Sequence, residues 1–124
     1  KYIQHNGAKV VIIKDVYTID GDQVYCSIYK KMFARFNECN SSLTAMQNKY
    51  KDTDDVFNYL ENKYKDSVIF IDPKKVLSNE SKYYTSIDNV VIYRDAGHIS
   101  YDGSKYVGKT YLEQYGNPFK QFDK

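Results

Sequence analysis

The stretch "VVIIKDV", residues 10–16, opens with four consecutive β-branched residues. A short apolar run of this kind is typical of a strand that is covered on both faces of a parallel sheet. A second apolar run, "SVIFIDP" at residues 67–73, is closed by Pro73, which cannot continue a ladder of sheet hydrogen bonds. The sequence therefore predicts two buried strands, and the segment between them decides how they connect.

An amphipathic helical pattern fills that segment. Apolar residues recur there at spacings of three and four, namely at Leu43, Met46, Tyr50, Phe57, Leu60 and Tyr64. The polar residues 51–55, "KDTDD", are expected to split the pattern, with Asp52 or Thr53 capping a second helix. A strand, a helix and a second strand form a βαβ unit, whose right-handed crossover predicts an α/β fold with helices on both faces of a parallel sheet. Sheets of this kind place functional sites at the carboxyl ends of their strands.

The flanking segments have clear signals as well. The opening residues "KYIQHNGAKVVII" are typical of the end of a helix, a Gly7 cap and then a strand, so we expect the chain to be the later part of a longer protein. Residues 17–42 are aromatic and irregular, which predicts a loop with a short helix near Ile28–Phe36. A last helix is expected from a Ser100 N-cap to Gly116. One face of that helix would carry Tyr106, Val107, Thr110, Tyr111 and Gln114.

Length and charge exclude several classes of protein. A chain of 124 residues suits a single domain, 1–124, that buries roughly two-thirds of its unfolded surface. The 18 basic and 16 acidic residues are nearly balanced, and the lysines are scattered along the chain, so nucleic acid is not an expected partner. No stretch approaches the ~20 apolar residues of a membrane span.

The two cysteines, Cys26 and Cys39, lie 13 residues apart without a CxxC motif. His5 and His98 are too far along the chain to complete a plausible ligand set with them, so neither a zinc site nor any other cofactor is expected. The thiols are either bonded or separately buried, and cysteine pairing favours the disulfide. A disulfide would imply an oxidising compartment.

Asp95 precedes His98 by three residues in the stretch "YRDAGHISYDGSKY", residues 93–106. In a tight loop this spacing lets the carboxylate reach the Nδ1 hydrogen of the imidazole, which fixes the tautomer and leaves Nε2 free to accept a proton. Asp95 and His98 are therefore the candidate catalytic residues, as the acid/base half of a triad. The alternative is a histidine in an ordinary surface turn or helix cap.

The block "YRDAGHISYDGSKYVG" resembles the last conserved block of the SGNH (GDSL-like) hydrolase domains that are fused to bacterial membrane acyltransferases of the acyltransferase-3 (AT3) family. The residues that match are Tyr93, Arg94, Asp95, His98, Ile99, Ser100 and Gly103. The "KVVII" strand, the cysteine-bearing insertion, the helical stretch and "VIFIDP" precede the block in the order of that family, so the resemblance covers nearly the whole chain. It implies a three-layer, flavodoxin-like α/β sandwich with a parallel sheet, of which this chain would be the carboxyl-terminal portion without the first strand or strands.

The resemblance also implies an activity. The chain would be part of an O-acyltransferase, with O-acetyl transfer to sugar hydroxyls of a surface polysaccharide or lipopolysaccharide as the expected reaction. His98 would be the general base and Asp95 its orienting partner. The expected partners are an acyl donor, a glycan acceptor and a membrane acyltransferase domain in the same parent chain. The expected location is a periplasmic, extracytoplasmic domain of an inner-membrane protein.

The family's nucleophilic serine lies in a Gly-Asp-Ser block, and this chain contains no such block. Covalent acyl transfer needs an activated hydroxyl and oxyanion donors in one site, so the chain alone is expected to be inactive. Ser100 is better explained as a helix cap, and Gly103 as room for close packing. The remaining alternatives are an SGNH-type carbohydrate esterase, a non-catalytic glycan-binding module built on the tyrosine-rich residues 17–36, and a plain interaction domain.

Overall fold

The computed structural model describes residues 2–33 and 38–123. Within these described residues thirteen elements follow one another: α1 (Tyr2–His5), β1 (Val10–Ile13), α2 (Gly21–Phe33), β2 (Ser41–Ser42), α3 (Leu43–Lys49), α4 (Lys51–Tyr64), β3 (Val68–Ile71), η1 (Pro73–Val76), β4 (Lys82–Tyr83), β5 (Ser86–Ile87), β6 (Val90–Val91), α5 (Tyr101–Tyr115) and η2 (Pro118–Phe122). None of the helices in these two ranges has the length and apolar character that crossing a membrane requires.

The two predicted strands pair in parallel, as the βαβ pattern indicates. β1 and β3 are in register from Val10 opposite Val68 to Ile13 opposite Ile71. Both strands therefore end at the same edge, where the Lys14 N–H still donates to the Ile71 carbonyl at 2.8 Å. The chain thus belongs to the α/β class, with a small parallel sheet.

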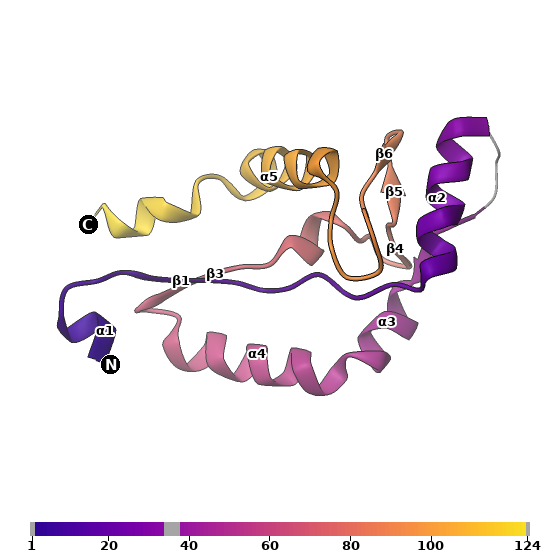
Figure 1. The fold of residues 1–124 in the computed structure, drawn as a ribbon. Helices are drawn as coiled ribbons and strands as arrows, with labels where there is room; N and C mark the ends of the chain where they lie inside the picture. The colour runs from indigo at the N-terminus through magenta and orange to yellow at the C-terminus, as the bar shows by residue number, and fades with distance from the viewer. Residues whose placement is uncertain (1, 34–37, 124) are drawn as a thin grey trace.

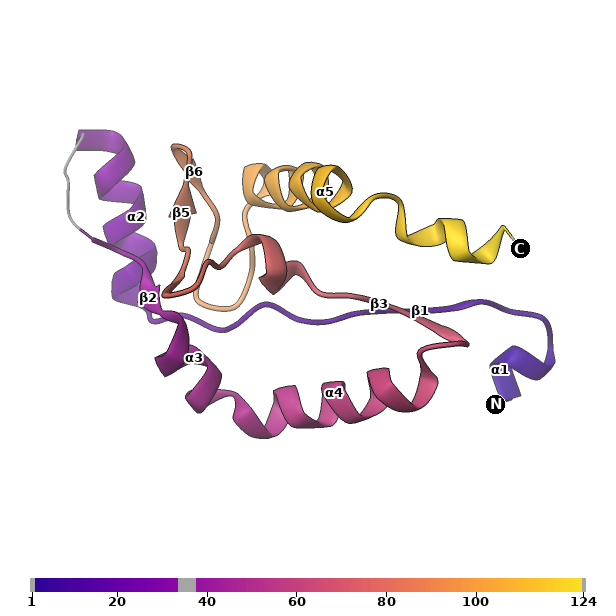
Figure 2. The ribbon, with the colours of Figure 1, turned by 180° about the vertical axis from the view of Figure 1, so that it is seen from behind.

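Helices flank the strand pair on two sides. α4 lies on one side, and α5 with η2 lies on the other, in both views of the ribbon (Figures 1 and 2). α5 packs on η1 and β6, while α4 and η2 contact β3. The layered arrangement expected from the sequence is therefore present around a sheet of two strands in the described residues.

The first strand is shorter and less covered than "VVIIKDV" predicts. β1 ends at Ile13, and residues 14–20 are neither helix nor strand, although Lys14 keeps the one hydrogen bond to the end of β3. The physical reason is that its partner strand ends at Ile71, because Asp72 and Pro73 turn into η1. Burial on both faces is also incomplete, since Ile13 is 67% exposed.

Residues 17–36 contain a longer helix than the sequence predicts. α2 begins at Gly21, not near Ile28, and residues 34–36 of the predicted helix lie outside the described residues. Val24 and Ser27 are its buried residues, so the inward face is narrow and half of it is polar, which hides the helical period. The predicted disulfide is present: Cys26 in α2 is bonded to Cys39.

The central helical segment is split, but not where the polar residues predict. α3 ends at Lys49 and α4 begins at Lys51, with Tyr50 as the residue between them. Neither Asp52 nor Thr53 caps α4; both lie inside it. Tyr50 leaves the helical path because its ring stacks on Tyr17 with centroids 5.0 Å apart, and its hydroxyl donates to the Thr18 carbonyl at 3.0 Å.

The last helix matches its sequence signals. The Ser100 hydroxyl accepts a hydrogen bond from the Gly103 N–H at 2.9 Å, and Gly116 ends α5 with a positive φ of 74°. Val107 and Tyr111 are buried, whereas Gln114, expected on the same face, is exposed. At Gly103, an added Cβ would lie 2.3 Å from the Ile92 carbonyl oxygen, so glycine is required for the approach of α5 to the chain after β6.

The core lies beyond the carboxyl ends of β1 and β3. Its most buried side chains are Leu77, Tyr83, Ile92 and Tyr93, none of which belongs to the parallel sheet. They come from the connection between β3 and α5, which includes the β5–β6 hairpin with its left-handed turn residues at positions 88 and 89. This core holds in place the segment that leads to the candidate residues Asp95 and His98.

Two glycines of α5 provide a matched test of that packing. We expect Gly103→Ala to lower the free energy of unfolding by about 1–3 kcal/mol, because the methyl group meets backbone that cannot move aside. Gly108→Ala, in the same helix with no atom within 4 Å of the new Cβ, should be neutral or raise it by up to about 1 kcal/mol. Urea denaturation of both variants measures the two values, and equal effects would show that the close contact is not needed.

The disulfide is expected to stabilise the fold by restricting the unfolded chain. Closing the 13-residue separation contributes roughly 3 kcal/mol in the chain-entropy model. The double variant Cys26→Ser, Cys39→Ser should lose about that amount in denaturant titration. Wild type under reducing conditions is the matched control, and it should lose the same amount. An unfolding midpoint that stays the same in the double variant and in the reduced wild type would contradict this role.

Candidate active site at the Asp95–His98 loop

The candidate residues lie in a tight loop between β6 and α5. Tyr93 and Ile99 form an antiparallel bridge across its base. Inside that bridge the Arg94 N–H donates to the His98 carbonyl at 2.9 Å. The loop thus closes on itself, which brings the side chains of Asp95 and His98 to the same place.

The aspartate and the histidine are hydrogen bonded as the spacing predicts. Asp95 Oδ1 lies 2.8 Å from His98 Nδ1 and also accepts from the His98 N–H at 2.9 Å and the Gly97 N–H at 3.0 Å. The other carboxylate oxygen, Oδ2, lies 3.3 Å from Arg94 Nε. One carboxylate therefore both shapes the loop and orients the imidazole.

The contact with His98 keeps the Asp95 carboxyl ionised. The His98 side chain, with the Gly97 N–H next in importance, lowers the pKa of the Asp95 carboxyl from 3.8 to about 2. An ionised carboxylate can only accept hydrogen bonds, so Nδ1 carries the hydrogen. The neutral ring then has its lone pair on Nε2, which can accept a proton from a hydroxyl.

The pair is open to a ligand. The side chains of His98 and Asp95 are 71% and 47% exposed. Within residues 2–33 and 38–123, no hydrogen bond involves His98 Nε2. The imidazole is therefore oriented on one side and available on the other.

The loop is attached to the segment that leaves β1. The Ile19 N–H donates to the Ala96 carbonyl at 2.9 Å, and Ile19 is 2% exposed. Because this segment continues from the carboxyl end of β1, the pair lies on the side of the sheet where parallel α/β folds place their sites.

The remaining residues of the motif have structural contacts. Tyr93 is 1% exposed, so it supports the loop from inside. The Ser100 hydroxyl caps α5 and donates to the Val91 carbonyl at 2.6 Å, which leaves it unsuited to act as a nucleophile. Arg94 pairs with Asp95, as a salt-bridging residue would.

A charged cluster at the strand ends was not anticipated from the sequence. Lys14, which follows β1 and is 5% exposed, pairs with Glu61 at 2.6 Å and Asp72 at 3.8 Å. Lys74 lies 3.2 Å from Asp72 and 3.7 Å from Asp54. These charges satisfy one another, which indicates that the cluster ties α4 to the sheet. The available signal was that a lysine and an aspartate each directly follow a strand.

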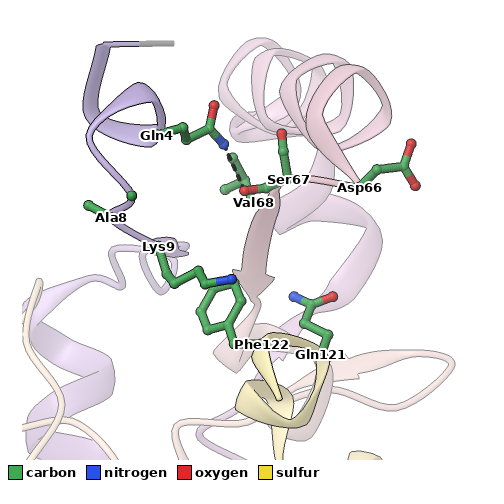
Figure 3. Close-up of a pocket in the computed structure, with 9 residues that line it drawn as sticks. Gln4, Ala8, Lys9, Asp66, Ser67, Val68, Gln121 and Phe122 are labelled. Carbon is green, nitrogen blue, oxygen red and sulfur yellow. Dashed lines mark hydrogen bonds between the residues drawn. The ribbon is translucent and has the colours of Figure 1, made fainter. Parts of the chain in front are cut away.

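A cavity among the described residues lies elsewhere. It has a volume of about 410 Å³ and lies at the amino ends of β1 and β3, between α1 and η2. Figure 3 shows Gln4 donating to Ser67, at 2.8 Å, and Lys9 reaching over the Phe122 ring. Its lining contains no histidine and no acid–base pair, so we place the candidate site at the 94–98 loop instead.

The lowered pKa of Asp95 predicts a pH effect on stability. A carboxyl whose pKa is lower in the folded state stabilises the fold above its unfolded value of 3.8, and that contribution is lost as the pH falls toward about 2. The difference in free energy of unfolding between wild type and Asp95→Asn should therefore shrink between pH 4 and pH 2. Denaturant titrations at several pH values measure this difference, with Asp22→Asn on the exposed first turn of α2 as the control. A difference that does not change with pH would contradict the lowered pKa.

Comparison with known families shows to which family the chain belongs. The model of the SGNH domain that is fused to AT3 domains matches residues 1–113. A comparison with curated proteins and with solved structures finds no match. The match includes the two parallel strands, the disulfide and the whole 94–98 loop. The chain therefore belongs to the family of SGNH domains fused to AT3 domains.

Proposed function

We propose that the chain supplies the acid/base half of an O-acyltransferase site, with His98 as the general base and Asp95 as its orienting partner. The observation that carries the proposal is the 2.8 Å contact between Asp95 Oδ1 and His98 Nδ1, in a loop that leaves Nε2 without a hydrogen bond among the described residues. Membership of the AT3-fused SGNH family supports acyl chemistry as the reaction class.

In this proposal His98 Nε2 acts twice. It first accepts the proton of a serine hydroxyl as the serine oxygen attacks the acyl carbonyl, and the resulting imidazolium protonates the leaving group. It then accepts the proton of a sugar hydroxyl as that oxygen attacks the acyl-enzyme, and the imidazolium returns the proton to the departing serine oxygen, which restores both residues. Throughout, the Asp95 carboxylate stabilises the charged ring without taking the proton itself. Water in place of the sugar would give an esterase.

The serine belongs outside these 124 residues. No Gly-Asp-Ser block occurs in the sequence, and the Ser100 hydroxyl is committed to the α5 cap. The chain alone would then have no acyl-transfer activity. An upstream part of the parent protein would contribute the nucleophile and the oxyanion donors, and a membrane acyltransferase domain in that protein would deliver the acyl group.

The disulfide supports an extracytoplasmic location. Bonds such as Cys26–Cys39 persist in oxidising compartments, among which is the bacterial periplasm. A surface glycan, for example a polysaccharide or lipopolysaccharide, is the sugar acceptor available there.

A glycan-binding module is the second candidate, because α2 exposes aromatic side chains on one face. Tyr25 and Tyr29 are 62% and 51% exposed, and Tyr29 stacks on Phe33 at 5.9 Å. Aromatic rings of this kind offer large amphipathic contact surfaces to a ligand. If the complete protein bound glycan without any acyl turnover, this candidate would replace the catalytic one.

The test of the catalytic proposal uses the complete natural protein that contains this chain. His98→Gln should lower the rate of acyl transfer by about 10²–10⁴-fold, because a general base contributes that much. Asp95→Asn should lower the rate strongly too, because the amide can present the wrong hydrogen-bonding group to Nδ1. Release of labelled acyl groups to glycan and to water, measured separately, also distinguishes a transferase from an esterase.

The chain offers a matched control for this experiment. His5, the only other histidine, is exposed at the end of α1, on the amino-end side of the sheet. His5→Gln should keep the wild-type rate. Full activity in His98→Gln would eliminate the general-base role.

A further inference from the structure

Tyr93 has a contact that the acid/base chemistry does not require. Its side chain is 1% exposed, and its hydroxyl donates to the Tyr17 carbonyl at 2.6 Å. The same hydroxyl oxygen lies 2.8 Å from the hydroxyl oxygen of Tyr83, which is completely buried. Tyr83 in turn accepts a hydrogen bond from the Tyr17 N–H at 3.3 Å.

The direction of each hydrogen bond in this group is determined. Tyr93 uses its single hydroxyl hydrogen on the Tyr17 carbonyl, so Tyr83 must be the donor in the contact between the two phenols. The bonds then form a closed ring, from the Tyr17 N–H to Tyr83, from Tyr83 to Tyr93, and from Tyr93 back to the Tyr17 carbonyl. We call these three residues the tyrosine ring.

The tyrosine ring replaces sheet pairing for the segment that follows β1. Tyr17 lies in residues 14–20, which have no strand partner in the described structure, yet its backbone is buried and must be hydrogen bonded. Two phenols satisfy its N–H and its carbonyl. One of these phenols belongs to the residue immediately before Arg94 and Asp95.

The proposed catalytic loop therefore has two attachments to that segment. Tyr93 holds its first residue through the tyrosine ring, and the Ala96 carbonyl holds its tip through Ile19. The side chains of His98 and Asp95 are 71% and 47% exposed, so the buried core does not enclose them. The position of the pair thus depends on the two attachments of its loop.

Burial keeps the tyrosine ring intact in neutral solution. Desolvation raises the pKa of Tyr83 to about 12, and it raises the pKa of Tyr93 further above its usual value. Both phenols remain protonated, so both remain donors.

We propose that Tyr93, together with Tyr83, is a positioning residue that holds the Asp95–His98 pair in register with the segment leaving β1. This inference rests on the function proposed above, because it assigns a support to the same pair. Removing the Tyr93 hydroxyl would leave the Tyr17 carbonyl without its donor and the hydroxyl hydrogen of Tyr83 without its acceptor. The loop would then lose one of its two attachments.

The test compares Tyr93→Phe with Tyr17→Phe by NMR of the histidine nitrogens and the aspartate carboxyl. Tyr93→Phe should reduce the fraction of His98 that carries its hydrogen on Nδ1, and it should move the titration midpoint of Asp95 upward from about 2 toward 3.8. Tyr17 takes part in the tyrosine ring only through its backbone, and its hydroxyl donates to Asp54. Tyr17→Phe should therefore leave both signals at wild-type values. Unfolding measured in parallel separates a loss of stability from a loss of positioning.

The outcomes distinguish this inference from the function on which it rests. Wild-type signals in a folded Tyr93→Phe would overturn the positioning role and leave the acid/base proposal standing. An unmodified protein whose His98 carries its hydrogen on Nε2 would overturn the acid/base proposal itself. If Tyr93→Phe does not fold, Tyr83→Phe takes its place, because it keeps the Tyr93–Tyr17 bond and should move the same signals less; no movement there would also overturn the positioning role.

In the complete protein the same variants have a kinetic signature. Tyr93→Phe should lower kcat with little change in KM, because a displaced base affects the chemical step more than substrate binding. Tyr17→Phe should keep the wild-type kcat. A Tyr93→Phe protein with unchanged kcat would contradict the inference.

Discussion

The parallel register of β1 and β3 is the constraint on which the rest of the structure depends. Because Ile13 and Ile71 end opposite each other, the chain leaves both strands at one edge. The segment after β1 cannot pair further, since Asp72 and Pro73 turn its partner into η1. Its backbone must find other hydrogen bonds, and it finds them in the buried tyrosines and in the loop before α5. The core and the candidate site are therefore both built where the sheet stops.

The exposed candidate pair and the buried residues that support it are separate parts of this arrangement. His98 and Asp95 are exposed and lie three residues apart in one loop, which leaves the pair accessible. Ile92 and Tyr93, which lead into the pair, are buried. Gly103 allows α5 to pack directly on the Ile92 carbonyl, which completes the support beneath the loop. The catalytic role that we propose for the pair requires such a support, because catalytic geometry tolerates little displacement.

The sequence predicted the features that neighbouring residues decide. The Ser100 cap, the Gly116 end of α5 and the contact between Asp95 and His98 each depend on residues no more than four apart. The parallel strand pair followed from apolar runs and the helical pattern between them. The predicted position of the break between α3 and α4 was wrong, because the polar residues 51–55 suit a helix as well as a break. The break lies at Tyr50, whose ring stacks on Tyr17.

By itself the sequence determined the α/β class, the family, the disulfide pairing of Cys26 with Cys39 and the contact between Asp95 and His98, since patterns and short spacings encode each of them. Only the tertiary structure decided where β1 ends, how long α2 is and what lies beneath the pair. The bond from Tyr93 to Tyr17 joins residues 76 positions apart, and one of fourteen tyrosines cannot be matched to a distant carbonyl from spacing alone. Long-range hydrogen bonds of this kind exist only once the core has formed, because burial is what makes an unpaired carbonyl costly.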